Sequence, residues 1–97
     1  MTGGGPADAL IRDLAIVNRR GLHARAAARF VKAVEEFDAT VTVEKDGQIV
    51  GGDSIMGLLM LAAAEGTTIR VSATGLEAAL ALTALAELLA ARFGEDE

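Results

Sequence analysis

The sequence contains no cysteine, tryptophan or tyrosine, and it has one histidine, His23, and one proline. Without cysteine there is no disulfide framework and no thiol chemistry, and we expect a cytoplasmic protein. With one histidine and no cysteine, only carboxylates remain as further metal ligands. We therefore expect neither a metal site nor a cofactor.

Long hydrophobic runs and a surplus of positive charge are also missing. The longest uncharged apolar run, Ile55 to Ala64, is too short to cross a bilayer and contains Gly57, so we expect no membrane insertion. The start of the chain lacks the basic region of a signal peptide. The net charge is −5, which argues against nucleic acid as a partner because phosphate neutralisation needs a basic face.

What the chain does have is enough apolar residues for one core. It is 97 residues long and 52% hydrophobic, which is typical of a single globular domain. We expect a flexible N-terminal tail over residues 1–9, one domain over residues 10–93, and an acidic C-terminal tail over residues 94–97.

The hydrophobic spacing predicts the element order β-α-β-β-α-β-α. Strands are expected at 10–17, 40–44, 49–50 and 67–73, with an Asp46-Gly47 hairpin turn between the second and third. Helices are expected from about residue 23 or 24, over 55–61, and from a capping box at 74–77 to about 93 with Gly94 as C-cap. We expect the leucines of the last helix, Leu76, Leu80, Leu82, Leu85, Leu88 and Leu89, to lie in the core. The order favours an α+β domain, an antiparallel sheet with helices over one face.

His23 follows the turn residues Gly21 and Leu22 and precedes an alanine-rich helical segment. A helix N-terminus offers unpaired N–H groups and the positive end of the helix dipole, which together favour phosphate. A neutral imidazole there is a nucleophile beside an anion site, and the planar fork of Arg25 suits phosphate oxygens. His23 is therefore a candidate phosphoryl carrier, with an ordinary surface or capping histidine as the alternative.

Positive charge is concentrated around this histidine although the whole chain is acidic. Between residues 12 and 32 the only acid is Asp13. The basic residues of this stretch are Arg12, Arg19, Arg20, Arg25, Arg29 and Lys32. Such a local field favours a bound anion or an acidic partner surface, and a solvated helix face is the alternative.

A second segment, Gly51 to Gly57, places Ser54 at the expected start of a short helix. Ser54 is an N-cap candidate, and a helix N-terminus could also receive a regulatory phosphate there. An esterase nucleophile is disfavoured, because the sole histidine lies upstream of Ser54 and no base follows it. The helix after Ser54 carries more apolar residues than one buried face can hold, so we expect some of them to form an exposed docking surface.

These two segments, in this order, resemble the HPr family of histidine-containing phosphocarriers of the bacterial phosphotransferase system and its nitrogen-related relatives. Gly21-Leu22-His23-Ala24-Arg25 is similar to the family's active-site block, and Asp53-Ser54-Ile55-Met56-Gly57 to its regulatory-serine block. The resemblance covers roughly residues 10 to 93. It implies an open-faced β-sandwich of four antiparallel strands with three helices on one face.

The resemblance also implies a carrier protein that is not itself an enzyme. Enzyme I, using phosphoenolpyruvate, would phosphorylate His23 at Nδ1, Arg25 would contact the phosphoryl group, and enzyme IIA-type proteins would accept it. Ser54 would be the target of an HPr kinase/phosphorylase. The residues expected to dock partners are Leu22, Ala24, Arg29, Lys32, Ile55, Met56 and Leu59.

One position departs from the family pattern. Ala26 stands where the family usually has proline after the active-site arginine, which puts local rigidity in question. Two classes of function stay open: a phosphocarrier that depends on His23, and a regulatory binding module for which Ser54 and the apolar surface suffice. The sequence does not separate a sugar-uptake branch from a nitrogen or regulatory branch.

Overall fold

The computed structural model describes residues 9–97, so most of the expected N-terminal tail lies outside the described residues. Four antiparallel strands form one sheet in the order β1-β4-β2-β3. Their bounds are β1 Leu10–Ala15, β2 Thr40–Lys45, β3 Gln48–Gly51 and β4 Thr68–Thr74. The first and last strands in sequence are therefore neighbours in the sheet.

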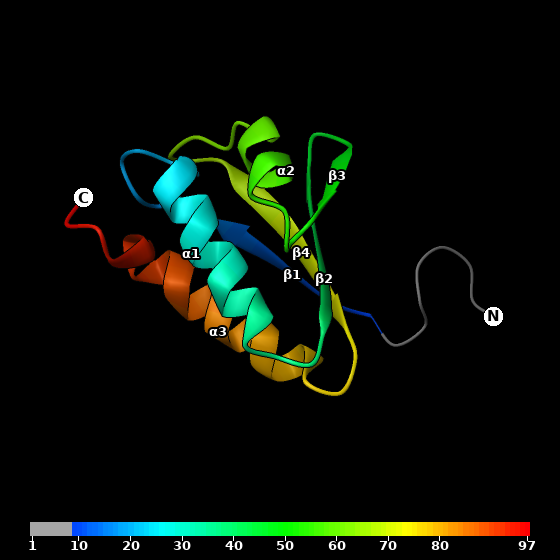
Figure 1. Cartoon of the computed structure of the whole chain (residues 1–97). Coiled ribbons are helices and arrows are strands. Elements are labelled where there is room, and N and C mark those ends of the chain that lie inside the picture. Colours follow the sequence, from blue (N-terminus) through cyan, green and yellow to red (C-terminus); the bar gives the residue numbers. More distant parts are fainter. Residues whose placement is uncertain (1–8) are drawn as a thin grey trace.

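Three helices cover one face of this sheet and leave the other face open (Figure 1). They are α1 (Ala24–Glu35), α2 (Ile55–Met60) and α3 (Ala78–Ala90), followed by the 3-10 turn η1 (Arg92–Gly94). The α+β architecture and the element order expected from the sequence are confirmed.

The core lies between the sheet and the helices because alternate strand residues point toward the helical layer. In the register, Leu14 faces Ile69 and Val43 faces Val71, and all four side chains are buried. The largest fully buried side chains are Phe30, Phe93, Ile16, Leu58, Ile69, Leu85, Leu89, Val43, Val71 and Asn18. Asn18 is the one polar residue in this set, and it lies in the loop between β1 and α1.

The local signals at the hairpin and at α2 are confirmed. Asp46 and Gly47 have φ angles of 52° and 82°, as a two-residue hairpin turn requires. Ser54 caps α2, because its Oγ accepts a hydrogen bond from the N–H of Gly57 at 3.0 Å.

The capping box predicted for α3 is wrong. The N-cap is Glu77, whose side chain makes no cap hydrogen bond and instead accepts one from the N–H of Asp38 at 2.7 Å. Gly75, with a φ of 114°, turns the chain so that Glu77 faces the neighbouring loop rather than the start of its own helix. A tertiary contact has replaced the local one.

The expected end of α3 and part of its buried face are also wrong. The helix ends at Ala90 with Ala91 as C-cap, because Arg92, Phe93 and Gly94 take φ angles of 58°, 55° and 81°, which cannot continue a helix. Leu76 and Leu80 are exposed, at 90% and 57%. Leu76 precedes the helix, and Leu80 points away from the core face, which Ala78 and Ala81 occupy in the first turn. The buried leucines of this helix are Leu82, Leu85 and Leu89.

Candidate functional site

His23 lies at the N-terminus of α1 because the preceding loop turns sharply at Gly21. Gly21 has a φ of 69°, and a Cβ there would come within 2.6 Å of the carbonyl oxygen of Ala63. The N–H of Leu22 donates to that same oxygen at 2.9 Å. The loop is thus pressed against the segment between α2 and β4, which fixes where α1 begins.

His23 is the N-cap residue of α1 in the extended conformation, and its side chain makes no cap hydrogen bond. Its carbonyl accepts from the N–H of Ala27, so the first-turn N–H groups of Ala24, Arg25 and Ala26 have no partner within the helix. These groups form a site where an anion is favoured. Ala26 is buried in the first turn and accommodated without distortion of the helix, so the departure from proline does not disturb α1.

The imidazole is largely covered, since its side chain is 16% exposed. The cover is Glu95, whose Oε2 is a hydrogen-bond partner of His23 Nε2. The other carboxylate oxygen of Glu95 accepts from Asn18 Nδ2 at 3.0 Å. The same Asn18 nitrogen donates to the carbonyl of Gly21 at 2.8 Å, so one buried amide connects the loop to the C-terminal segment.

The chain returns to the histidine through residues 92–97, which we call the C-terminal strap. The guanidinium of Arg29 on α1 donates to the carbonyl of Phe93, whose side chain is buried. At the far end, Arg19 donates its backbone N–H to the carbonyl of Glu97 and pairs with the Glu97 carboxylate at 2.8 Å. The strap, which includes the acidic tail expected at 94–97, is therefore attached to both α1 and the histidine loop.

Glu95 is held as a carboxylate. Burial opposes its ionisation, but hydrogen bonds from Asn18 and His23, the positive charge of His23 when it is protonated, and the charge of Arg20 outweigh burial, so the pKa of Glu95 lies below its ordinary value. An ionised carboxylate only accepts hydrogen bonds. Asn18 and His23 must both be donors to it.

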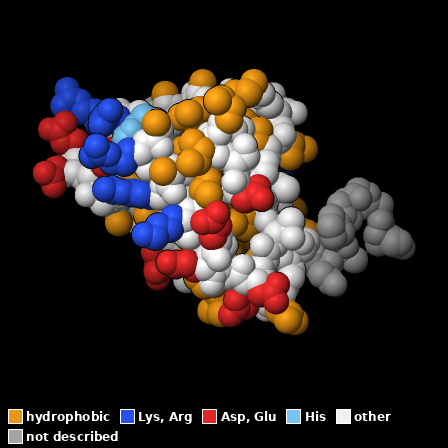
Figure 2. Space-filling model, in the orientation of Figure 1, with side chains coloured by type: hydrophobic (Ala, Val, Ile, Leu, Met, Phe, Trp, Pro, Cys, Tyr) orange, Lys and Arg blue, Asp and Glu red, His pale blue; other side chains and the backbone are white. Residues whose placement is uncertain are grey.

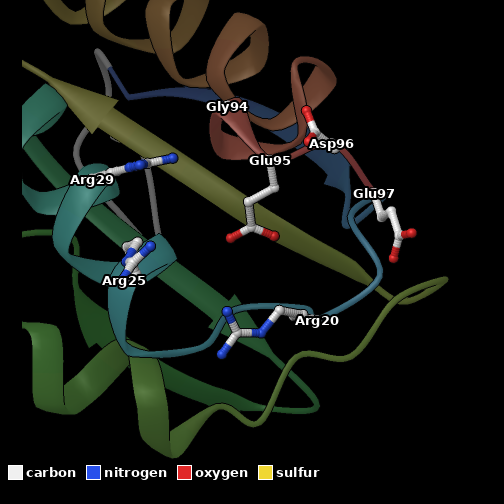
Figure 3. A pocket seen from close by; sticks show the side chains of 7 residues that line it. All are labelled: Arg20, Arg25, Arg29, Gly94, Glu95, Asp96 and Glu97. Carbon is white, nitrogen blue, oxygen red and sulfur yellow. The ribbon is translucent and has the colours of Figure 1, made fainter.

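A cavity of about 420 Å³ opens beside this cluster. Figure 3 shows cationic side chains from the loop and α1 facing acidic side chains from the strap across it. Its lining residues are Arg20, Arg25, Arg29, Gly94, Glu95, Asp96 and Glu97. Of the expected site residues, Arg25 and Arg29 line this cavity, and His23 contacts it through Glu95. The cavity also includes acidic residues that the sequence had assigned to a tail.

The second predicted site forms a separate surface over α2. Ile55, Met56 and Met60 are exposed, at 42%, 68% and 62%, and we call them the α2 patch. Figure 2 shows these two kinds of surface side by side, with Lys and Arg side chains near the histidine and hydrophobic side chains over α2. The expectation that part of α2 stays uncovered is confirmed.

The other expected docking residues divide between surface and core. Ala24, Arg29 and Lys32 are exposed, and Leu59 is half-buried. Leu22 is only 5% exposed because it packs in the core, so it offers almost no surface to a partner. The expectation that Leu22 docks partners is therefore withdrawn.

Sequence reasoning missed Asn18 and Glu95, and it named Arg20 only as one of the basic residues around His23. Asn18 gave a weak signal as a polar residue directly after the apolar run from Leu14 to Val17. Glu95 gave none, since acidic residues at the end of a chain are ordinarily solvated. Their roles depend on contacts between positions 72 and 77 residues apart.

Two kinds of feature that the sequence led us not to expect, metal-ligand clusters and membrane-spanning helices, can be compared with the described residues. Within residues 9–97, no group of three or more potential ligands is placed to hold a metal ion. In that same part of the chain, no helix is long and apolar enough to cross a membrane.

Comparison with known proteins gives one consistent result. Residues 11–91 match the family model described as "PTS HPr component phosphorylation site". The chain is 44% identical over 88 residues to a phosphocarrier protein HPr of Neisseria meningitidis, covering 91% of this chain and 99% of that one. It is 40% identical to a phosphocarrier protein NPr of Shewanella violacea, covering 89% and 94%.

Solved structures agree with this result. An HPr structure from Thermoanaerobacter tengcongensis superimposes with a TM-score of 0.86 at 38% identity, covering 91% of this chain and 99% of that one. An HPr from Bacillus anthracis gives a TM-score of 0.78 at 38% identity, covering 81% and 94%. Fold and site therefore define a small phosphoryl-carrier domain. The chain belongs to the HPr family, the phosphocarriers of the phosphotransferase system, which carry a phosphoryl group and are not enzymes.

Proposed function

We propose that this protein accepts a phosphoryl group on His23 from enzyme I, which takes it from phosphoenolpyruvate, and passes it to enzyme IIA-type proteins. The observation that carries the proposal is the position of the chain's only histidine, at an uncapped helix N-terminus beside a cluster of arginines. Nucleophile and anion site are adjacent there. A phosphocarrier needs both, the nucleophile to accept the phosphoryl group and the anion site to stabilise its oxygens.

The chemistry is set by the ring and its surroundings. A ring nitrogen of His23 attacks phosphorus, the N–P bond forms, and the bond between phosphorus and the donor breaks with its electron pair going to the donor. The unpaired N–H groups of Ala24, Arg25 and Ala26 stabilise the phosphoryl oxygens, as does the Arg25 guanidinium. Transfer onward reverses these steps with the acceptor as nucleophile.

Ser54 and the α2 patch supply a partner surface with its own control. Ile55 and Met56 are flexible or branched apolar side chains exposed on a short helix, which suits contact with more than one partner. Phosphorylation of Ser54 by an HPr kinase/phosphorylase would add about −1.5 to −2 charges beside that surface. The effect would fall on binding of an acidic partner face rather than on the fold.

The test is phosphorylation with purified enzyme I and phosphoenolpyruvate, followed by intact-mass spectrometry under mildly alkaline conditions, since phosphohistidine is acid-labile. The wild type should gain one phosphoryl group, and the His23→Ala variant should gain none. The Ser54→Ala variant, which is the matched control, should gain one. Uptake by the His23→Ala variant would overturn the assignment of His23. No uptake by the wild type would favour the regulatory binding module instead.

A further inference from the structure

The contact between Glu95 and His23 places a carboxylate against the ring of the proposed phosphoryl carrier, so any role of Glu95 in transfer rests on that proposed function. Both side chains are 16% exposed, so water competes weakly for their hydrogen bond. The carboxylate has two oxygens, and each has one partner: Oε2 lies at His23 Nε2 and Oε1 at Asn18 Nδ2. The Asn18 amide is itself fully buried, so it holds Glu95 in one orientation.

This arrangement decides where the proton of the neutral imidazole lies. The carboxylate accepts only, so Nε2 must be the protonated ring nitrogen. Nδ1 then carries the lone pair. A neutral imidazole has one donor nitrogen and one acceptor nitrogen, and the partner of one determines the role of the other.

We propose that Glu95 is a positioning residue for phosphoryl transfer, which holds the proton of His23 on Nε2 and thereby presents Nδ1 as the nucleophile. When Nδ1 forms its bond to phosphorus and the donor's bond breaks, the ring keeps its Nε2 proton and becomes positively charged. The Glu95 carboxylate lies against that charge and stabilises it. When the acceptor takes the phosphoryl group, the electron pair of the N–P bond returns to Nδ1 and the charge disappears.

The C-terminal strap is built to deliver this carboxylate. Three consecutive residues, Arg92 to Gly94, have positive φ angles, a costly conformation for the two that are not glycine. The buried Phe93 side chain and the hydrogen bond from Arg29 to its carbonyl hold the turn. Gly94 allows the close approach, since a Cβ there would come within 3.0 Å of the Arg29 guanidinium.

An amide at position 95 gives a sharp test because it has only one acceptor oxygen. In Glu95→Gln, that oxygen is needed by Asn18, which is buried and can only donate from Nδ2. The amide NH₂ then faces His23 Nε2 and donates to it. The ring proton moves to Nδ1 and the nucleophilic lone pair is lost from that atom.

The experiment compares wild type, Glu95→Ala, Glu95→Gln and the control Glu36→Gln, which is the same chemical change at an exposed residue at the opposite end of α1 from His23. The first readout is a long-range ¹H–¹⁵N spectrum of the ring, which is unambiguous because the chain has one histidine. The second is the initial rate of phosphorylation by enzyme I and phosphoenolpyruvate, with thermal unfolding to confirm folding.

We expect the Nε2–H ring in the wild type and the control, and the Nδ1–H ring in Glu95→Gln. Phosphorylation should be about tenfold slower in Glu95→Ala and slower still, about 100-fold, in Glu95→Gln. Loss of charge alone would not make the isosteric amide worse than alanine, so this order identifies the positioning role.

Two results would overturn the inference. Wild-type phosphorylation rates in both Glu95 variants would show that the contact has no role in transfer. Faster phosphorylation than in the wild type would show that the strap inhibits transfer. If the wild-type protein takes up no phosphoryl group, the proposed function is overturned instead. This outcome can be told apart from the other two, because the ring spectra are recorded on the unphosphorylated protein.

Discussion

The histidine site and the α2 patch lie on helices that pack against each other, yet they are built in different ways. The histidine site joins three parts of the chain: the loop at 18–23, the start of α1, and the C-terminal strap. Its histidine and glutamate side chains are hydrogen-bonded to each other and largely covered. The α2 patch comes from one short segment, with a local serine cap and apolar side chains left uncovered.

On the proposed function, the difference separates two tasks within one small domain. Chemistry at His23 needs a fixed ring, and a fixed ring needs partners from outside its own segment. Recognition of partners needs accessible apolar area, which a short helix can offer without help. Substitutions in the two regions should therefore have effects of different kinds.

The largest effect is expected where the histidine loop is pressed against its neighbour. Gly21→Ala forces a side chain into a φ of 69° and places its Cβ 2.6 Å from the carbonyl oxygen of Ala63. The backbone conformation alone should cost about 1–3 kcal/mol of unfolding free energy, and the close contact adds to this. Urea denaturation measures the loss. The control is Gly47→Ala, which also has a positive φ but has open space around the added Cβ.

Asn18→Asp should break the connection between loop and strap. The change replaces the donor to Gly21 and Glu95 with an oxygen that faces two acceptors, and we expect a loss of about 1–3 kcal/mol. Gln48→Glu, the same chemical change on the exposed hairpin, should leave the unfolding free energy nearly unchanged. Equal stability of the two variants would show that the Asn18 network does not hold the site.

Arg25→Lys should act on transfer and spare stability. Lysine keeps the charge but loses the planar fork, and Arg25 is exposed and lines the cavity beside His23. A charge-assisted hydrogen bond is worth about 1.5–3 kcal/mol, so the phosphorylation rate should fall about tenfold or more. Stopped-flow or quench-flow transfer from phosphorylated enzyme I measures it, and an unchanged rate would contradict contact with the phosphoryl group.

Ser54 sharpens the comparison because its two possible roles, helix cap and regulatory site, predict that different substitutions are harmful. Ser54→Ala loses the hydrogen bond to Gly57, which should cost about 1 kcal/mol, whereas Ser54→Asp retains a cap. If Ser54 also regulates docking, Ser54→Asp should slow His23 phosphorylation and Ser54→Ala should not. A Ser54→Asp variant as fast as wild type would leave Ser54 as a cap only.

The smallest effect is expected in the pH dependence of stability. The pKa of Glu95 is lowered in the folded state below its ordinary value of 4.5, so its contribution is present above that pH and is lost as the pH falls further. The gap in unfolding free energy between wild type and Glu95→Gln should therefore narrow on acidification. Denaturation of both proteins across the acidic range checks this, and a constant gap would argue against an ionised Glu95.

Much of the fold could be predicted because its signals are local. The alternation of Val41 and Val43, the turn at Asp46-Gly47 and the helical spacing of Phe30 and Val34 each depend on side-chain burial or backbone conformation within a few residues. For the same reason the cap at Ser54 and the exposure of α2 were predicted correctly. His23 and Arg25 could be selected as candidates because a short motif carries them.

The rest was decided by tertiary structure. Glu77 follows the capping-box spacing, but its carboxylate accepts a hydrogen bond from the backbone N–H of Asp38, because the chain reversal at Gly75 brings that loop within reach. Glu95 lies in an acidic segment that is indistinguishable from a solvated tail in the sequence. The buried Phe93 and the positive φ angles around it turn that segment back onto His23, over a separation of 72 residues. The sequence by itself determined which residue is the candidate nucleophile. The packing of α3 and the strap decided which ring nitrogen of that residue has a hydrogen-bond partner in the fold, because hydrogen bonds between distant segments exist only once the core has formed.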